Sequence, residues 1–295
     1  MTRTSVVIAT LGRAEPLQRA LAALAVCSPA PDEVVVVDGD PQAGAATVVA
    51  AAPETPYPVR HVRAPRGLTR QRNVGLREAD GDVVLFLDDD ARPEPDLLDL
   101  LRQAYADEAV VGATGRVFEP ASNAVGGKSS PVRALLPGGG REGGFTRFGY
   151  PRRLRDETLD RDVEFMAGCF MSARLALARE VGFDERLTGY GLAEDEDFSC
   201  RLARRGRVRY LGGAVVHHDN RGFGGRDRRA FGRQVVANRS YLFRKNFAQT
   251  PVARAQFWLL LLVLGGHRLL NRDAAGARGL LEGAVALAVG RPLEV

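Results

Sequence analysis

Three consecutive aspartates, Asp88, Asp89 and Asp90, follow a mostly apolar, β-branched run at residues 82–87. The run predicts a short buried strand, and ligands of open α/β sheets bind beyond the carboxyl ends of strands. Adjacent carboxylates repel one another unless a cation lies between them, and Mg²⁺ or Mn²⁺ takes its ligands from carboxylates and substrate phosphates. The triplet therefore predicts a metal–diphosphate site, although a solvated acidic turn would explain this feature on its own.

Three further groups of carboxylates and imidazoles lie where strands are predicted to end or a helix to begin. They are Asp38 with Asp40, residues 194–197, and His217 with His218. Asp38 would share a sheet edge with the aspartate triplet, so a nucleotide could lie along this edge with its base near Asp38. Each group has a plainer explanation, because acids favour any helix start and paired histidines occur in polar turns. Their joint occurrence in this order favours an active site.

The elements that must position these groups alternate along the first half of the chain. Short apolar runs predict strands, and leucines and alanines at helical spacing predict helices between them. Such alternation is typical of a parallel, doubly wound sheet. The predicted strands lie at residues 5–9, 33–37, 59–62 and 82–87, and the predicted helices at residues 17–24, 44–52 and 69–78.

The second half has a different composition. Residues 119–144 are rich in Gly, Pro and Ser and predict a long loop, which is either a functional lid or a disordered insertion. A helix is predicted to begin at residues 194–197 and to end in arginines before Gly206. The tail is predicted to be helical, but its apolar run at residues 257–264 is much shorter than the about 20 residues that span a membrane.

The composition bounds the class of protein. Of the 295 residues, 45% are hydrophobic and 26% are charged, which suits one large domain or two fused domains. Cys27, Cys169 and Cys200 have no metal-ligand spacing, so free thiols in a reducing, cytoplasmic setting are expected. The first residues lack the apolar stretch of a signal peptide. The formal net charge of +5 favours an anionic ligand or an anionic membrane surface.

Six segments between residues 4 and 245 match one protein family in order and spacing. They are the strand at 5–10 with Arg13, the strand that ends at Asp38, the Arg-Gln-Arg-Asn-Val-Gly stretch at 70–75, the strand and Asp-x-Asp motif at 81–90, the block at 168–195, and His217. With these residues the chain resembles the family 2 glycosyltransferases, which have the GT-A fold. The resemblance implies an α/β fold with a GT-A-type, doubly wound and mostly parallel central sheet, followed by a helical C-terminal tail.

The resemblance also implies a division of the chain. Residues 1–118 would form a Rossmann-like half that binds the nucleotide sugar. Residues 119–249, including the loop at 119–144, would form the catalytic half that binds the acceptor, and residues 250–295 the tail. Such an enzyme moves a sugar from a nucleoside-diphosphate sugar to an acceptor hydroxyl with inversion, and here the acceptor would be a cell-envelope, polysaccharide or lipid-linked glycan.

Roles for individual residues come from the same resemblance. Asp195 is the expected general base, with Glu194 second. A divalent cation, Mn²⁺ or Mg²⁺, would neutralise the leaving diphosphate and be held by Asp90 and His217, with His218 left open as the alternative to His217. The residues expected to bind the donor are Thr10, Arg13, Asp38, Arg72, Asn73, Asp88 and Asp89.

Two departures from the family pattern refine these expectations. Gly39 stands where the family often has a second acid in the nucleoside loop, with Asp40 as a substitute. The Gln-x-x-Arg-Trp signature of processive members is absent, which implies a single sugar addition. The tail, an apolar run flanked by arginines, is expected either to touch the inner face of the cell membrane peripherally or, more simply, to pack as a core helix or mediate a homodimer.

Two other classes of protein compete with this interpretation. Haloacid-dehalogenase-type phosphatases also place Asp-x-Asp after a buried strand, but they require Thr or Val where Arg92 stands. A basic module that binds nucleic acid or membrane would use the arginines at residues 201–209 and 226–233. These runs hold a single aromatic residue, Phe231, and so lack the interleaving of aromatic and basic residues typical of nucleic-acid binding, and a nucleic-acid partner is not expected.

Overall fold

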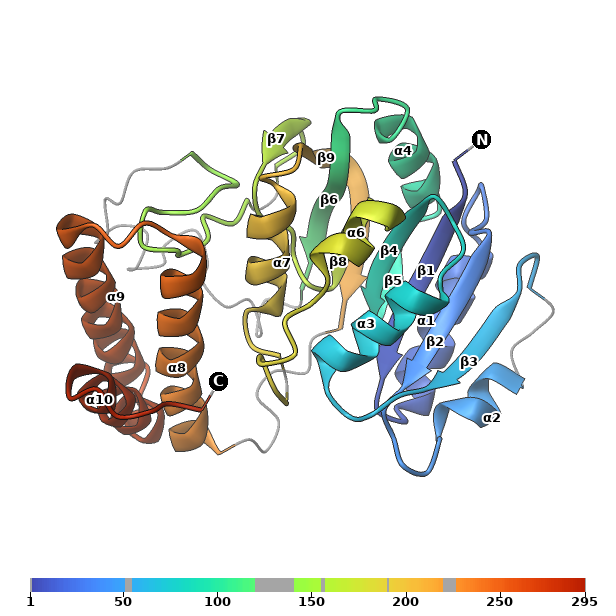
Figure 1. Cartoon of the computed structure of the whole chain (residues 1–295). Helices are drawn as coiled ribbons and strands as arrows, with labels where there is room; N and C mark the ends of the chain where they lie inside the picture. The colour runs from blue at the N-terminus through green and yellow to red at the C-terminus, as the bar shows by residue number, and fades with distance from the viewer. Residues whose placement is uncertain are drawn as a thin grey trace. The chain divides into compact units, whose positions relative to one another are not determined.

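The computed structural model describes residues 2–50, 55–119, 141–154, 157–189, 191–219 and 227–294. The chain forms two compact units, Met1–Ser122 with Leu154–Asn220, and Asn123–Arg153 with Arg221–Val295 (Figure 1). We call them the sheet unit and the helical unit. Most of the predicted loop at 119–144, namely residues 120–140, lies outside the described residues.

The sheet unit is built on one nine-stranded sheet. The strands lie side by side in the order β3 (Val59–Arg63), β2 (Glu33–Asp38), β1 (Thr4–Thr10), β4 (Val83–Asp88), β8 (Phe170–Arg174), β6 (Val110–Phe118), β9 (Arg207–His218) and β5 (Ala91–Pro93), with β7 (Arg161–Val163) paired to β9. All four strands predicted in the first half of the chain are present, at the expected places.

Strand direction changes within the sheet. β3, β2, β1 and β4 are parallel, whereas β8 is antiparallel to both of its neighbours, β4 and β6. β6 and β9 are parallel to each other, and the short β5 and β7 are antiparallel to β9. The predicted α/β fold with a mostly parallel central sheet and a helical C-terminal tail is confirmed.

Helices cover both faces of this sheet, because successive side chains of a strand point to opposite sides. In β1, Val6 and Ile8 belong to one core and Val7 to the other, and all three are buried. Helix α1 buries Leu17 and Leu24 at the helical spacing read from the sequence. The first core includes α1 (Ala14–Ala25), α2 (Ala45–Ala50) and α4 (Leu97–Ala104), and the second includes α3 (Leu68–Glu78), α6 (Leu175–Val181) and α7 (Glu194–Leu202).

Helix α3 lies unusually close to β1. A Cβ atom at Gly75 would be 2.3 Å from Cγ1 of Val7, which is too close for any other residue type without a shift of the helix. One turn earlier, the Gln71 side-chain amide donates to the carbonyls of Thr10, at 2.7 Å, and Val37, at 2.9 Å. α3 is therefore fixed at the carboxyl ends of β1 and β2, where the predicted donor site lies.

The helical unit contains α8 (Arg228–Asn246), α9 (Pro251–Leu270) and α10 (Ala274–Ala288). Each of the first two helices begins at a residue that caps free backbone N–H groups. The Asp227 carboxylate accepts from the N–H groups of Arg229 and Ala230, and the Thr250 hydroxyl accepts from Ala253. The predicted helical tail thus consists of two helices, α9 and α10.

The three helices pack around a small core of their own. The rings of Phe243 and Phe257 stack with centroids 5.0 Å apart. A Cβ atom at Gly279 would lie 1.9 Å from the Arg229 carbonyl oxygen, so the glycine is what lets α10 approach α8 this closely. Within the described ranges, we find no helix with the length and apolar character that crossing a membrane requires.

Candidate active site

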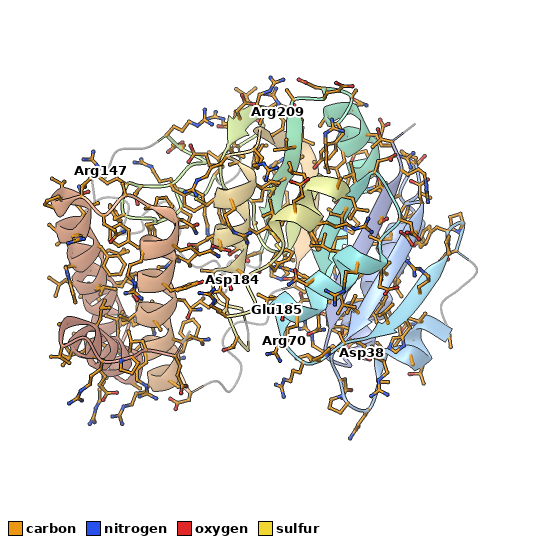
Figure 2. All side chains as sticks on the ribbon, viewed as in Figure 1. Asp38, Arg70, Arg147, Asp184, Glu185 and Arg209 are labelled. Atoms are coloured by element: carbon orange, nitrogen blue, oxygen red, sulfur yellow. The ribbon has the colours of Figure 1, made fainter. Side chains whose placement is uncertain are left out.

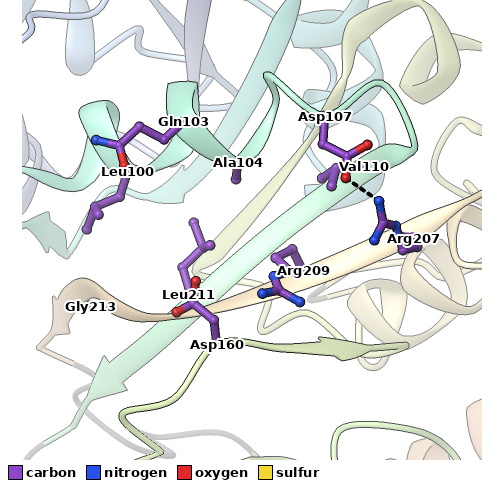
Figure 3. Close-up of a pocket in the computed structure, with 10 residues that line it drawn as sticks. All are labelled: Leu100, Gln103, Ala104, Asp107, Val110, Asp160, Arg207, Arg209, Leu211 and Gly213. Atoms are coloured by element: carbon purple, nitrogen blue, oxygen red, sulfur yellow. Dashed lines mark hydrogen bonds and ion pairs between the residues drawn. The ribbon is translucent and has the colours of Figure 1, made fainter.

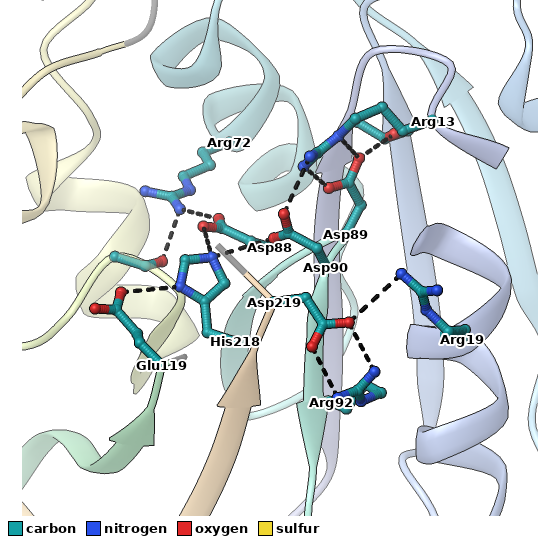
Figure 4. A network of polar contacts seen from close by, with 12 residues as sticks. Arg13, Arg19, Arg72, Asp88, Asp89, Asp90, Arg92, Glu119, His218 and Asp219 are labelled. Carbon is teal, nitrogen blue, oxygen red and sulfur yellow. Dashed lines mark hydrogen bonds and ion pairs between the residues drawn. The ribbon is translucent and has the colours of Figure 1, made fainter. Parts of the chain in front are cut away.

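Two aspartates and a histidine converge at the carboxyl end of β4 (Figure 4). Asp88 ends β4, and the chain turns through Asp90 into β5. Because β5 pairs antiparallel with the end of β9, in the register Ala91 opposite His218, the imidazole is brought to the aspartates. Nε2 of His218 lies 3.1 Å from Oδ1 of Asp90 and 3.6 Å from Oδ2 of Asp88. One ligand atom from each residue fits within 4.8 Å of the others, a spacing that could hold a metal ion.

The donor set fits a divalent cation. Oδ1 of Asp90 is buried and, although His218 is near, receives no hydrogen bond of acceptable geometry from the described residues. A buried carboxylate oxygen without a donor is costly, and a cation would satisfy it. Burial alone would raise the pKa of Asp90, but His218 and Arg13 beside it lower that pKa to about 2, so the carboxylate is ionised.

His218 is held from its other side. Oε1 of Glu119 lies 3.3 Å from Nδ1 of His218, the arrangement in which Nδ1–H donates to a carboxylate and Nε2 faces a metal. Burial would lower the pKa of His218, whereas Cys169, Asp90 and Glu119 raise it. A proton and a metal ion would compete for Nε2, because only the neutral imidazole binds metal. Glu119 was not identified as a site residue from the sequence, where it is only the first residue of the predicted loop at 119–144.

The structure does not bring His217 to the aspartates. As the preceding residue of β9 it points to the opposite face, where its Nε2 lies 2.7 Å from Oε1 of Glu94 and its ring stacks on Phe118 at 5.5 Å. Of the two histidines that the sequence left open, His218 is therefore the one whose position would let it share a metal ion with Asp88 and Asp90.

Thr10 and Arg13 hold the middle aspartate of the triplet. Asp89 is almost fully buried, and its Oδ2 accepts from the Thr10 hydroxyl at 2.6 Å and from Nε of Arg13 at 3.0 Å. Nη1 of Arg13 also donates to Oδ2 of Asp90 at 3.0 Å. Burial raises the pKa of Asp89 to about 6, against the lowering effect of Thr10 and Arg13. These three predicted donor-binding residues thus contact one another and fix the shape of the triplet.

Arg72 joins the metal site to the acidic start of α7. Its side chain is only 2% exposed, yet it donates to Oδ1 of Asp88 at 3.0 Å, to the Gly168 carbonyl at 2.7 Å and to Oε1 of Glu194. The N–H of Gly168 donates to Oδ2 of Asp195 at 3.2 Å. Burial and the neighbouring Asp195 raise the pKa of Glu194, with Arg72 opposing them. Glu194 and Asp195, the two candidates for the general base, are therefore connected to the predicted metal site by one network of contacts.

The remaining predicted donor residues have structural partners of their own. Both carboxylate oxygens of Asp38 accept backbone N–H groups, from Asp40 at 2.9 Å and Ala45 at 3.0 Å, which closes the loop after β2. The Asn73 side chain exchanges two hydrogen bonds with the backbone of Phe183, at 2.8 and 2.9 Å. Neither residue contacts the aspartate triplet.

The edge of α3 carries a further contact to the segment after α6. Figure 2 marks Arg70 and Glu185, whose Nε and Oε2 atoms are 3.8 Å apart, together with Asp38 at the end of β2. The Asn73 amide donates to the same glutamate at 2.9 Å. Arg70 and Asn73 of α3 therefore hold Phe183 and Glu185, within the Gly-Phe-Asp-Glu segment at residues 182–185, against this helix.

A separate cavity of about 350 Å³ lies at the other end of β9, between α4 and the starts of β6 and β9 (Figure 3). Its arginines are paired, Arg207 with Asp107 and Arg209 with Asp162 at 3.1 Å. Arg201 and Arg205 pair with Asp197 and Glu180, at 2.7 and 2.6 Å. The basic run at residues 201–209 is thus largely neutralised by acids of the same unit, which weakens the case for a nucleic-acid module.

Comparison with known proteins finds a matching family and solved structures of similar fold. The family model described as Glycosyl transferase family 2 matches residues 5–182. No curated protein matches the sequence. Among solved structures, S. aureus TarS 1–349 in complex with UDP is 16% identical, with 92% of this chain and 73% of that chain covered and a TM-score of 0.59. The mannosyltransferase PcManGT from Pyrobaculum calidifontis, in complex with GDP-Man and Mn²⁺, is 21% identical, with 98% and 81% covered and a TM-score of 0.59. Identities this low show a shared fold.

Proposed function

This chain belongs to the family 2 glycosyltransferases, and we propose that it is an inverting enzyme that moves one sugar from a nucleoside-diphosphate sugar to a hydroxyl group of a glycan or lipid-linked acceptor. The observation that carries the proposal is the buried guanidinium of Arg72, which contacts both Asp88 at the candidate metal site and Glu194 beside Asp195. One network thus holds the group that would serve the leaving diphosphate and the group that would serve the attacking hydroxyl.

Asp90 and His218 are the proposed metal ligands, with Asp88 beside them. A divalent ion held there would neutralise the charge that grows on the leaving diphosphate. Carboxylate oxygens with one imidazole suit Mn²⁺ or Mg²⁺, and the mannosyltransferase of similar fold is a complex with Mn²⁺. The chain's own part is to keep Asp90 ionised, through His218 and Arg13, and to keep it in place, through an Arg13 side chain that Asp89 also holds.

Asp195 is the proposed general base, and Glu194 the residue that positions Arg72. Glu194 is engaged by the guanidinium, and its raised pKa reflects burial beside a second acid. The contact of Asp195 with the Gly168 N–H fixes its orientation. A positioned base contributes roughly 10²–10⁴-fold to the rate.

Replacing Asp195 tests this assignment. Asp195→Asn should lower the rate of transfer by roughly 10²–10⁴-fold and leave nucleoside-diphosphate binding in Mn²⁺ unchanged, because the carboxylate acts on the acceptor. Near-normal transfer by this variant would contradict the role of Asp195, and Glu194→Gln would then be the variant to measure. NMR of the product adds a check, since retention at the anomeric carbon is incompatible with a single displacement.

The nucleotide is the least specified part of the donor. The similar folds are complexes with UDP and with GDP-Man, which supports a nucleoside-diphosphate sugar as a class. Because both oxygens of Asp38 accept backbone N–H groups, we assign Asp38 to shaping the nucleoside loop.

The phosphatase alternative has no support at the position that distinguishes it. Where such an enzyme requires Thr or Val, Arg92 donates to both oxygens of Asp219, at 2.7 and 2.8 Å. Release of phosphate from simple phosphomonoesters, at a rate comparable to sugar transfer, would overturn the transferase proposal.

We further propose that the acceptor belongs to a cell-envelope or polysaccharide glycan and is met at the cytoplasmic face of the membrane. The +5 net charge and the arginines of the tail support this location.

A further inference from the structure

One side of α9 is exposed and apolar from end to end. Leu262 is 73% exposed and Leu270 is 83% exposed. A surface helix of a globular protein ordinarily presents charged and polar residues on its outer side, and this helix presents none there. The exposed positions, which recur at helical spacing, are Val252, Ala255, Leu259, Leu262, Gly266, Leu269 and Leu270.

The opposite side of the same helix already has its packing partners. Ala253, Phe257, Leu260 and Leu261 are buried in the core of the helical unit. A helix that is apolar on both sides needs an apolar environment on both sides. The outer side of α9 therefore calls for a second apolar contact.

Helix α10 adds a second exposed apolar stripe. Leu281 and Val285, together with Val289 directly after the helix, are each more than half exposed, whereas Leu280 and Gly283 of α10 face the core. We call the exposed stripes of α9 and α10 together the apolar face.

Charge around the apolar face indicates what covers it. The segments of the helical unit hold 19 Lys and Arg against 5 Asp and Glu, a net charge of +14, whereas those of the sheet unit hold 22 against 31, a net charge of −9. Arg254 lies near the start of α9, Arg272 directly after its end and Arg278 on α10, and all three are exposed. A second copy of this unit would bring a second charge of +14 against the first, which disfavours a homodimer here.

We infer that the apolar face docks on the surface of an anionic lipid bilayer, with α9 and α10 lying in the interface. An apolar helix side with a cationic rim binds such a surface through buried area and attraction to acidic headgroups. Trp258, partly exposed at the edge of the stripe, suits the headgroup level. This inference goes beyond the proposed transfer reaction and does not depend on it.

Vesicle flotation of the full chain, without substrates, tests the docking. The protein should float with vesicles of phosphatidylcholine and phosphatidylglycerol at low salt, bind neutral phosphatidylcholine vesicles more weakly, and release from the anionic vesicles as salt rises. Leu262→Gln with Leu270→Gln should weaken binding by about tenfold for each leucine. Arg254→Gln with Arg272→Gln should weaken it by on the order of 25-fold on anionic vesicles only.

The matched control is Leu159→Gln, which replaces a leucine of the sheet unit that is 66% exposed. It should float like the unchanged protein, and all variants should keep the same circular dichroism spectrum. Either of two results would overturn the inference: no flotation on anionic vesicles at low salt, or an equal loss of flotation in the Leu159 control. If flotation is absent, a dimer in sedimentation that Leu262→Gln dissociates would assign the apolar face to a second copy of the chain instead. Transfer to a water-soluble acceptor, measured in parallel, separates a failure of docking from a failure of the enzyme.

Discussion

In the sheet unit acids outnumber bases by 31 to 22, whereas in the helical unit bases outnumber acids by 19 to 5. The candidate site acids of the sheet unit are buried or half-buried, and Asp88 and Glu194 both pair with Arg72. The arginines that rim α9 are exposed. The difference teaches that the two units use charge differently: fixed, paired charges prepare a specific site, and an unbalanced surface charge attracts an extended anionic partner.

The largest effect on stability is expected from replacing Arg72, which pairs with two acids of the sheet unit. Arg72→Ala should lower the free energy of unfolding by about 3–5 kcal/mol, because it leaves Glu194 buried without its cation and frees Asp88. Arg77→Ala, at an exposed position of the same helix, should change it by less than about 0.5 kcal/mol. Urea denaturation of both variants gives the comparison, and similar losses for the two would refute the role of the Arg72 network.

The contact between Glu119 and His218 is expected to strengthen metal binding. Glu119→Gln should weaken Mn²⁺ binding by roughly 10–100-fold, because a neutral amide is a poorer partner for His218 Nδ1–H.

The matched control for that change is Glu94→Gln, which alters the partner of His217 at 2.7 Å. Titration calorimetry with Mn²⁺ should show no change for it. If Glu94→Gln weakened Mn²⁺ binding and Glu119→Gln did not, His217 rather than His218 would be the metal ligand.

The smallest effect on stability is expected from replacing a glycine of the helical unit by alanine. Gly279→Ala should lower the free energy of unfolding by about 1–3 kcal/mol, because its methyl group would meet the Arg229 carbonyl. Gly266→Ala, where a methyl group meets nothing within 4 Å, should raise it by up to about 1 kcal/mol. Thermal denaturation of the pair checks the opposite signs, and stabilisation by both would show that α8 and α10 do not pack this closely.

The parts predicted correctly from the sequence are those decided locally. The strand at Val83–Asp88 follows from its own apolar residues, and the aspartates come next in the chain. The choice between His217 and His218 could not be made, because it depends on the pairing of β5 with β9, two strands far apart in sequence. The role of Glu119 depends on the same end of the sheet and was missed for the same reason.

The charge difference between the two units could not be predicted from the sequence either. Every charge could be counted in the sequence, but the two segments of the helical unit are separated by residues of the sheet unit. Summing them requires the fold. The exposed side of α9 was foreseen only as an apolar run at 257–264, because which side packs on Phe243 depends on tertiary contacts.

The central claim is that Asp90 holds a divalent cation which binds the nucleoside diphosphate, and calorimetry of UDP and GDP with and without Mn²⁺ tests it most directly. Mn²⁺ should tighten binding of the preferred nucleotide at least about tenfold in the unchanged protein, as a several-kcal/mol metal contribution requires. The same should hold for Asp80→Asn, which alters an exposed aspartate of the same unit. Asp90→Asn should abolish the Mn²⁺ effect. An undiminished Mn²⁺ effect in Asp90→Asn, or nucleotide binding that excess chelator leaves unchanged in the unaltered protein, would contradict the account.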